Sequence, residues 1–139
     1  MYKADVSPLT AMDGLSSSPT ARLIDVRTVE EWAEVGGPSV PGRLAIEWLT
    51  MPTGDINPNF VDQVERAGVS KDDDLYILCR TGPRSIAAAE ALTAAGYTSV
   101  YNVLEGFEGD ADVDGNRGTV SGWQYHGLPW GFDEQRSAA

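Results

Sequence analysis

The chain of 139 residues contains one cysteine, Cys79, and one histidine, His126. A single cysteine cannot form an intrachain disulfide, which suits a reducing compartment. One cysteine with one histidine gives no support for a structural zinc site, and we expect neither a metal nor a cofactor. No motif supplies an Asn or Asp to orient His126 as a partner of the thiol, so the histidine is predicted to be a surface or packing residue.

The sequence also lacks an apolar run long enough to span a bilayer, and residues 1–6 show no basic region followed by an apolar stretch. We therefore predict a cytoplasmic protein without a secretory signal. Basic residues are scarce: the chain has ten Lys and Arg residues against 21 Asp and Glu residues, which gives a net charge of −11. Nucleic acids and anionic membranes both need a basic surface, so we expect neither as a partner. A small anionic substrate needs local positive charge on such a chain.

Length and composition indicate one globular domain. A chain of 139 residues buries enough surface for a single core, and 42% hydrophobic with 22% charged residues is ordinary for such a domain. We expect the folded domain to cover residues 1–132. Residues 133–139 form a polar tail that we expect to fray.

Five apolar segments that favour strands alternate along the chain with four segments that favour helices. Ser7 before Pro8 is a typical N-cap and first helical residue, and Thr28 with Glu31 has the spacing of a capping box. Alternation of this kind predicts an α/β fold, a mostly parallel five-stranded sheet with helices on both faces. The predicted strands are residues 2–6, 23–26, 44–46, 75–78 and 99–103, and the predicted helices are 8–15, 28–35, 57–68 and 85–95.

Cys79 lies where the fourth predicted strand ends, directly before residues 80–85 and an alanine-rich helix. The unpaired N–H groups at a helix N-terminus favour an anion, and Arg80 and Arg84 add positive charge. Such surroundings favour a thiolate, and ligands of parallel sheets bind beyond the carboxyl ends of the strands. We therefore predict that Cys79 is a nucleophile in an active loop at the carboxyl end of the fourth strand. The alternative is a buried apolar cysteine that closes the strand.

Two motifs resemble those of rhodanese-like domains. Residues 23–32, LIDVRTVEEW, resemble the opening motif of that family, and residues 79–85, CRTGPRS, resemble its active loop. The resemblance covers about residues 2–131. Within that span, the family's closing strand and last helix are matched by residues 96–103, 105–107 and 122–129.

The resemblance implies a sulfurtransferase of the thiosulfate sulfurtransferase type. Cys79 would take a sulfane sulfur from a donor such as thiosulfate or a persulfide, form a persulfide, and pass the sulfur to a thiophilic acceptor such as a thiol or cyanide. The partners we expect are therefore a small sulfur donor and acceptor, with an acceptor protein as a further one. A non-catalytic module that uses the same loop to bind a protein or peptide is the alternative.

Successive N–H groups of the active loop and the helix N-terminus are expected to stabilise the persulfide anion. Gly82 can adopt the backbone angles of a tight loop, whereas Pro83 has no N–H to donate. Arg84 is expected to face the leaving anion or to lock the loop, and Arg80 to point outward and help bind the donor. Ser85 is predicted to cap the helix, with a hydrogen bond to the sulfur as the weaker alternative. The loop comprises Arg80, Thr81, Gly82, Pro83, Arg84 and Ser85.

Side chains outside the loop have supporting roles in this interpretation. Asp25 and Arg27, at the end of the second predicted strand, are expected to support the loop through an ion pair or hydrogen bonds rather than to act in catalysis. The four tryptophans are predicted to pack in the core or at its rim, with Trp48 as a candidate for the pocket mouth.

Two other functions fit less well. Phosphatases and arsenate reductases of related architecture have an arginine six residues after the cysteine, where this chain has Ser85, so the loop is too short to wrap a phosphate. Residues 110–115, DADVDG, have the spacing that opens a calcium loop, but Ser121 occupies the position of the bidentate glutamate. We expect an acidic, solvated loop there.

Overall fold

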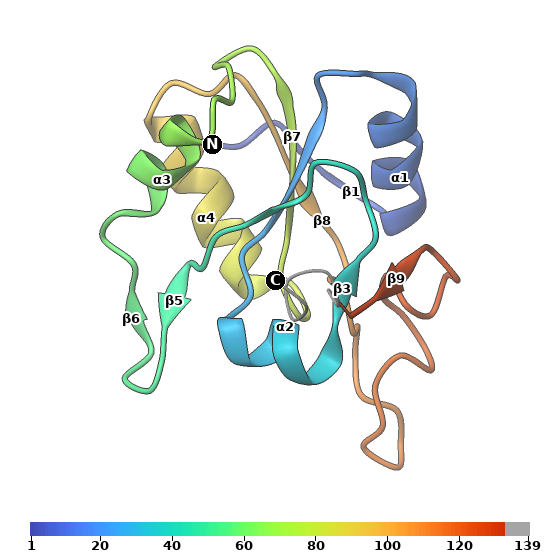
Figure 1. Cartoon of the computed structure of the whole chain (residues 1–139). Helices are drawn as coiled ribbons and strands as arrows, with labels where there is room; N and C mark the ends of the chain where they lie inside the picture. Colours follow the sequence, from blue (N-terminus) through green and yellow to red (C-terminus); the bar gives the residue numbers. More distant parts are fainter. Residues whose placement is uncertain (133–139) are drawn as a thin grey trace.

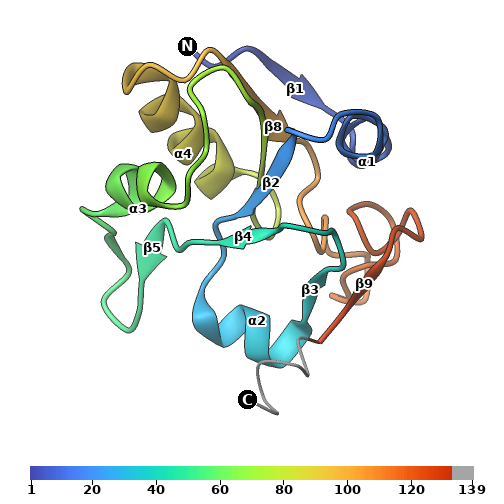
Figure 2. The same ribbon diagram turned by 45° about the horizontal axis from the view of Figure 1, so that its top comes forward.

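A computed structural model describes residues 1–132, and a five-stranded parallel sheet lies at its centre (Figures 1 and 2). The strand order is β1-β8-β7-β2-β4, and each neighbouring pair is parallel. The predicted parallel sheet is confirmed, while the predicted tail at 133–139 lies outside the described residues. The strands are β1 (Ala4–Val6), β2 (Arg22–Asp25), β4 (Leu44–Ala45), β7 (Asp74–Leu78) and β8 (Ser99–Val103).

Four helices connect the strands, and two of their predicted caps are confirmed. The Ser7 hydroxyl accepts a hydrogen bond from the Thr10 amide, and Thr28 forms a capping box with Glu31. The helices are α1 (Pro8–Ser17), α2 (Val29–Val35), α3 (Phe60–Arg66) and α4 (Pro83–Ala94).

Helix α4 starts two residues earlier than predicted, with Gly82 at its N-cap and Pro83 in its first turn. Proline suits that position because its missing N–H would have no helical partner there. The last helix predicted within residues 122–129 is wrong, since that segment forms turns. Gly122 and Gly127 have positive φ angles of 103° and 72°, which a right-handed helix cannot contain.

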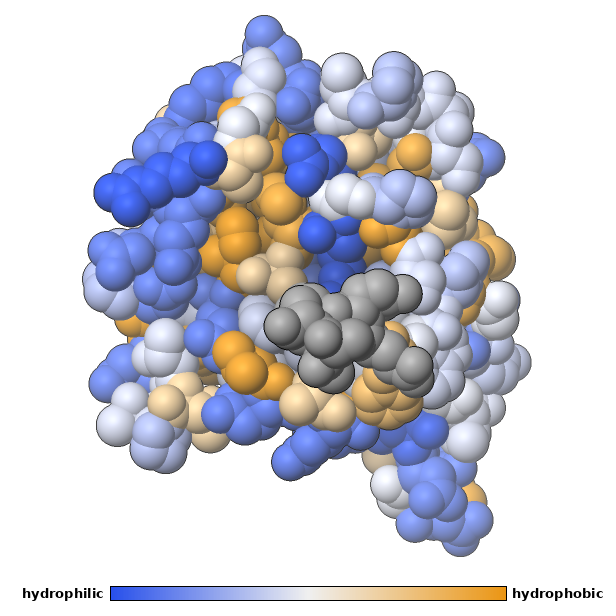
Figure 3. All heavy atoms as spheres, in the orientation of Figure 1, coloured by the Kyte–Doolittle hydropathy of each residue, from blue (hydrophilic) through white to orange (hydrophobic). Residues whose placement is uncertain are grey.

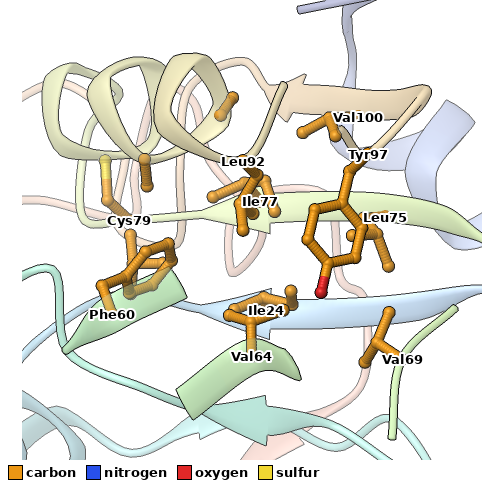
Figure 4. Packing of buried hydrophobic residues seen from close by; sticks show 13 residues of the cluster. Ile24, Phe60, Val64, Val69, Leu75, Ile77, Cys79, Leu92, Tyr97 and Val100 are labelled. Atoms are coloured by element: carbon orange, nitrogen blue, oxygen red, sulfur yellow. The ribbon is translucent and has the colours of Figure 1, made fainter. Parts of the chain in front are cut away.

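Helices cover both faces of the sheet, as predicted. Along β7 the side chains alternate between two cores, because successive residues of a strand point to opposite faces. Leu75 and Ile77 pack with α3 and α4 in one core, shown in Figure 4, whereas Tyr76 and Leu78 pack with α1 in the other. Ala88 and Ala89 of α4 are fully buried, so small side chains let this helix approach the sheet closely.

Two small ribbons beside the sheet were not predicted. One pairs β3 (Gly37–Pro38) with β9 (Trp130–Gly131), and the other pairs β5 (Leu49–Thr50) with β6 (Asp55–Ile56). Strands of two residues are too short to show an alternating pattern in the sequence.

Trp48 is partly buried and packs against the core, and it is not part of the pocket lining. Its ring meets Phe60 edge-to-face at a centroid distance of 5.2 Å, against the core beneath α3. On the molecular face seen in Figure 3, hydrophilic side chains dominate the periphery and apolar ones gather towards the middle. None of the helices within residues 1–132 combines the length and the apolar composition that crossing a bilayer requires.

Candidate active site

Cys79 directly follows β7, at the carboxyl end of the sheet and below the first turn of α4. Its side chain has no solvent-exposed surface and belongs to the core that packs against α3 and α4. Figure 4 shows its sulfur directed towards α4. The placement at a strand end agrees with the predicted nucleophile, whereas the complete burial agrees with the alternative of a structural cysteine. The polar contacts of the sulfur bear on the choice between the two.

Two polar groups of the active loop contact the sulfur. The Gly82 amide donates a hydrogen bond to Cys79 Sγ at 3.0 Å, and the thiol donates to Ser85 Oγ at 3.3 Å. Gly82 has a φ of 144°, a backbone angle that favours glycine at this position. Within the described residues, this amide is the one backbone donor to the sulfur, because Pro83 has no N–H. A purely apolar cysteine would not need such contacts.

Ser85 does not cap α4, because Gly82 is the N-cap and Ser85 is the third residue of the helix. Its contact with the sulfur, the weaker of the two predicted roles, is present instead. The Ser85 hydroxyl also lies 2.7 Å from the Gly82 carbonyl oxygen and 2.5 Å from Asn102 Oδ1. The sequence reasoning missed Asn102. An amide among the apolar residues of the strand Ser99–Val103 was the available signal.

Arg84 pairs with a carboxylate of α2, a contact that suits the second of its two expected roles, locking the loop. Its guanidinium donates to both carboxylate oxygens of Glu31, at 2.6 and 2.9 Å, and so joins α4 to α2. Burial by itself would raise the pKa of Glu31. The hydrogen bonds and charge of Arg84, with help from Thr28, outweigh burial and hold that pKa below its ordinary 4.5. The hydrogen bond to Glu31 in turn raises the pKa of Arg84.

Arg80 points outward, as expected, but its side chain is paired. Its Nε lies 3.2 Å from a carboxylate oxygen of Glu108, and 45% of its side-chain surface is exposed. The backbone of residues 106–109 runs along the loop, because Phe107 N donates to Cys79 O and Glu108 N donates to Arg80 O. This segment forms a wall behind the loop that the sequence motifs did not reveal.

Asp25 and Arg27 form a buried ion pair, and neither side chain has exposed surface. Arg27 donates to both Asp25 oxygens, at 2.9 and 2.8 Å, and to the Gly36 carbonyl oxygen at 2.7 Å. Its guanidinium stacks over the Phe107 ring at 4.3 Å. The pair therefore supports the active loop through the wall of residues 106–109, and it ties the end of β2 to the end of α2.

A pocket of about 680 Å³ opens beside the active loop, between α2 and the β5–β6 ribbon. Its ionisable lining consists of four glutamates and two arginines, and both arginines are paired with a glutamate. Glu30 and Glu34 are exposed and have no ion pair within residues 1–132. The lining residues are Thr28, Glu30, Glu31, Glu34, Val35, Leu49, Met51, Pro52, Arg80, Arg84 and Glu108.

The acidic segment and the histidine lie apart from this arrangement. Asp112 accepts hydrogen bonds from the amides of Asp114 and Asn116 and from the Thr119 hydroxyl, so its carboxylate organises its own loop. The Thr119 hydroxyl is the main reason why the pKa of Asp112 lies below its ordinary value. His126 Nε2 contacts Glu105 at 3.0 Å, as a packing residue would.

A model of the rhodanese-like domain family matches residues 8–112 of the chain. This match covers well over half of the 139 residues and includes the active loop. The chain therefore belongs to the rhodanese-like domain family.

Similar proteins extend the match to nearly the whole chain. An uncharacterized protein of Rickettsia conorii is 36% identical over 133 residues, which cover 95% of this chain and 100% of the relative. The crystal structure of Rv0390 from M. tuberculosis is 42% identical, with a TM-score of 0.87, and the match covers 94% of this chain and 98% of that one. Thiosulfate sulfurtransferase 16, a chloroplastic protein of Arabidopsis thaliana, is 28% identical over 110 residues, 78% of each chain. The family and this last relative support a sulfurtransferase.

We predict that Gly106→Ala disturbs the active loop. A Cβ at Gly106 would meet the carbonyl carbon and oxygen of Arg80 at 2.5 Å and the Cys79 carbonyl oxygen at 2.7 Å. The control is Gly115→Ala, since both glycines have positive φ but nothing lies within 4 Å of a Cβ at Gly115. We expect Gly115→Ala to cost about 1 kcal/mol of unfolding free energy and Gly106→Ala about 2–4 kcal/mol, measured by chemical denaturation. Equal costs for the two variants would contradict the contact argument.

We also predict that the Arg84–Glu31 pair weakens in acid. Because the pKa of Glu31 is lowered in the folded state, its stabilisation is complete above the ordinary value of 4.5 and is lost as the pH falls through the lower folded pKa. Near neutral pH, Glu31→Gln should cost about 1 kcal/mol of unfolding free energy, because the pair is largely shielded from solvent. This difference from wild type should shrink as the pH falls below 4.5 and through the lower folded pKa of Glu31.

The matched control for the acid experiment is Asp62→Asn. Asp62 pairs with Arg66 on the surface of α3, where 51% and 79% of the two side chains are exposed. An exposed pair contributes only about 0.3–0.5 kcal/mol, so the control should change stability little. A cost of Glu31→Gln that stays constant from neutral to acidic pH would show that the ion pair does not stabilise the loop.

Proposed function

We propose that this protein transfers sulfane sulfur through a persulfide on Cys79. The observation that supports this most strongly is the contact between Cys79 Sγ and the Gly82 amide, 3.0 Å apart at the N-terminus of α4. That amide and the positive end of the helix favour a negatively charged sulfur at this place. Membership of the rhodanese-like family supports the same chemistry.

The reaction has two halves. The Cys79 thiolate attacks the outer sulfur of a donor such as thiosulfate, the sulfur–sulfur bond of the donor breaks, and sulfite leaves with the electron pair. The enzyme is then a persulfide, whose outer sulfur is attacked by a thiol or cyanide, and the cysteine thiolate leaves. Storage of sulfur on the enzyme predicts ping-pong kinetics. A small acceptor or an acceptor protein fits this scheme, and the unpaired thiol suits a reducing, cytoplasmic setting.

Transfer requires the active loop to move, because the sulfur has no exposed surface. The Gly82 amide and the Ser85 hydroxyl contact the sulfur, and the Arg84–Glu31 pair joins the first turn of α4 to α2. Opening of this loop is therefore part of the proposed cycle, as in enzymes whose loops open to admit substrate. The same burial favours the second candidate, a module that binds a partner without turnover. Steady-state sulfur transfer distinguishes the two.

The pocket favours an uncharged or cationic donor over a dianion. Arg80 and Arg84 are both paired with glutamates, so neither presents free positive charge, and Glu30 and Glu34 add negative charge. A carboxylate-rich mouth repels anions and lowers their local concentration. The Arg84–Glu31 pair also argues against a phosphatase, whose arginine must face the phosphate.

We expect Cys79 to gain one sulfur atom when the protein is treated with a sulfane-sulfur donor. Mass spectrometry of the intact protein and of its peptides measures this gain, and Cys79→Ser should show none. Added cyanide or thiol should remove the sulfur and regenerate the starting mass. If no donor, whether thiosulfate, a polysulfide or an organic trisulfide, modifies Cys79, the persulfide mechanism is wrong.

We further expect the double substitution Glu30→Lys with Glu34→Lys to favour thiosulfate. The ratio of kcat/KM for thiosulfate to that for an uncharged organic trisulfide should rise about three- to tenfold at low salt and less at high salt. The control is Asp72→Lys with Asp114→Lys, which changes the net charge by the same amount at two exposed residues outside the pocket lining. An equal rise in the control would show that net charge, rather than the pocket, selects the donor.

A further inference from the structure

Asn102 is a buried polar residue that the proposed chemistry does not use. It lies in β8, with only 1% of its surface exposed. Its amide joins two distant parts of the chain, because Nδ2 donates to Asp5 in β1 at 3.0 Å and Oδ1 lies 2.5 Å from the Ser85 hydroxyl. A chain of hydrogen bonds thus runs from Asp5 at the surface through Asn102 and Ser85 to the sulfur of Cys79.

Asp5 determines which way the Asn102 amide faces. An ionised carboxylate only accepts hydrogen bonds, so the amide must direct its NH₂ group towards Asp5. The Tyr2 hydroxyl and the Asn102 amide both donate to Asp5, and they lower the pKa of its carboxyl group, which keeps it ionised. The amide oxygen of Asn102 therefore faces Ser85, and the reverse orientation would place an oxygen against an oxygen.

The Ser85 hydroxyl has one proton and two oxygen acceptors for it. Asn102 Oδ1 at 2.5 Å and the Gly82 carbonyl oxygen at 2.7 Å can only accept, so the proton points to one of them. Cys79 Sγ, at 3.3 Å, then meets a lone pair of the serine oxygen. A thiol donates to such a lone pair, whereas a thiolate would lie against an acceptor.

We propose that Asn102, oriented by Asp5, is a positioning residue that directs the Ser85 proton away from the sulfur and so favours the thiol form of Cys79 while the loop is closed. The significance for catalysis rests on the proposed function, but the hydrogen-bond chain does not depend on it. A neutral thiol also agrees with the complete burial of the sulfur, since an anion would be costly to bury there. Ser85 therefore restrains the nucleophile in the closed loop, while the Gly82 amide favours its charged form.

The test is the rate at which iodoacetamide alkylates Cys79 near neutral pH. Ser85→Ala removes the acceptor of the thiol proton, and we expect alkylation about fivefold faster, equivalent to one hydrogen bond of about 1 kcal/mol. Asn102→Leu frees the Ser85 proton to turn towards the sulfur, so alkylation should also be faster. In the Ser85→Ala background, Asn102→Leu should have no further effect, because its action requires the hydroxyl.

Two further variants separate this role from loss of packing. Val100→Ala weakens the core at a fully buried site in the same strand without touching the hydrogen-bond chain, and it should leave alkylation of the folded protein unchanged. Asp5 lies at the exposed end of the hydrogen-bond chain, and Asp5→Asn allows the Asn102 amide to reverse. This substitution should accelerate alkylation when Ser85 is present and have no effect in the Ser85→Ala background. Melting temperatures show whether each variant is folded at the assay temperature.

Two outcomes would overturn the proposal. Slower alkylation of Ser85→Ala would mean that the hydroxyl donates to the sulfur, and an equal effect of Asn102→Leu with and without Ser85 would mean that Asn102 acts through packing. Neither outcome depends on sulfur transfer. Failure of the proposed function would appear separately, as the absence of a persulfide on Cys79 in a protein whose alkylation still follows the expected pattern.

Discussion

The arrangement around Cys79 depends on the ion pair between Arg84 and Glu31, which joins the first turn of α4 to α2. The pair closes the active loop over the sulfur, and it removes from the pocket the guanidinium best placed to bind an anion. It also keeps Glu31 ionised, because the charge of Arg84 lowers the pKa of its carboxyl group despite burial. The connection between α4 and α2 and the neutralisation of Arg84 thus have one physical cause, and Glu30 and Glu34, which have no ion pair in the described part of the chain, make the pocket acidic.

The groups around Cys79 act in opposite directions on the protonation state of its sulfur. The Gly82 amide and the N-terminus of α4 favour a thiolate, whereas burial and the lone pair of Ser85 favour the thiol. In the cycle that we propose, Cys79 is restrained while its sulfur is buried, and it reacts when the loop opens and water or substrate replaces the serine contact. The structure therefore combines a reactive position in the fold with a restrained side chain.

Much of the fold was predictable because its signals are local. Ser7 and Thr28 act on amides within the next three residues, and β8 spans the five residues predicted for it. The turns at 122–127 were mistaken because positive φ at glycines produces them. The β3–β9 ribbon was missed because it pairs distant segments, and the β5–β6 hairpin because its strands have only two residues each. For the site, the motif located the loop and Cys79 within it. It did not reveal Glu31 and Asn102, which contact Arg84 and Ser85 of the loop from elsewhere in the chain.

By itself, the sequence determined the order of the five sheet strands and the four helices, the position of Cys79 between a strand and a helix, and the acidic charge of the chain, because these follow from local pattern and composition. Tertiary structure alone decided that Arg84 meets Glu31, 53 residues away, and that Ser85 meets Asn102, 17 residues away. It also decided that the sulfur is covered. Such contacts form because the carboxyl ends of parallel strands lie side by side at one edge of the sheet. No local sequence pattern encodes which side chains face each other there.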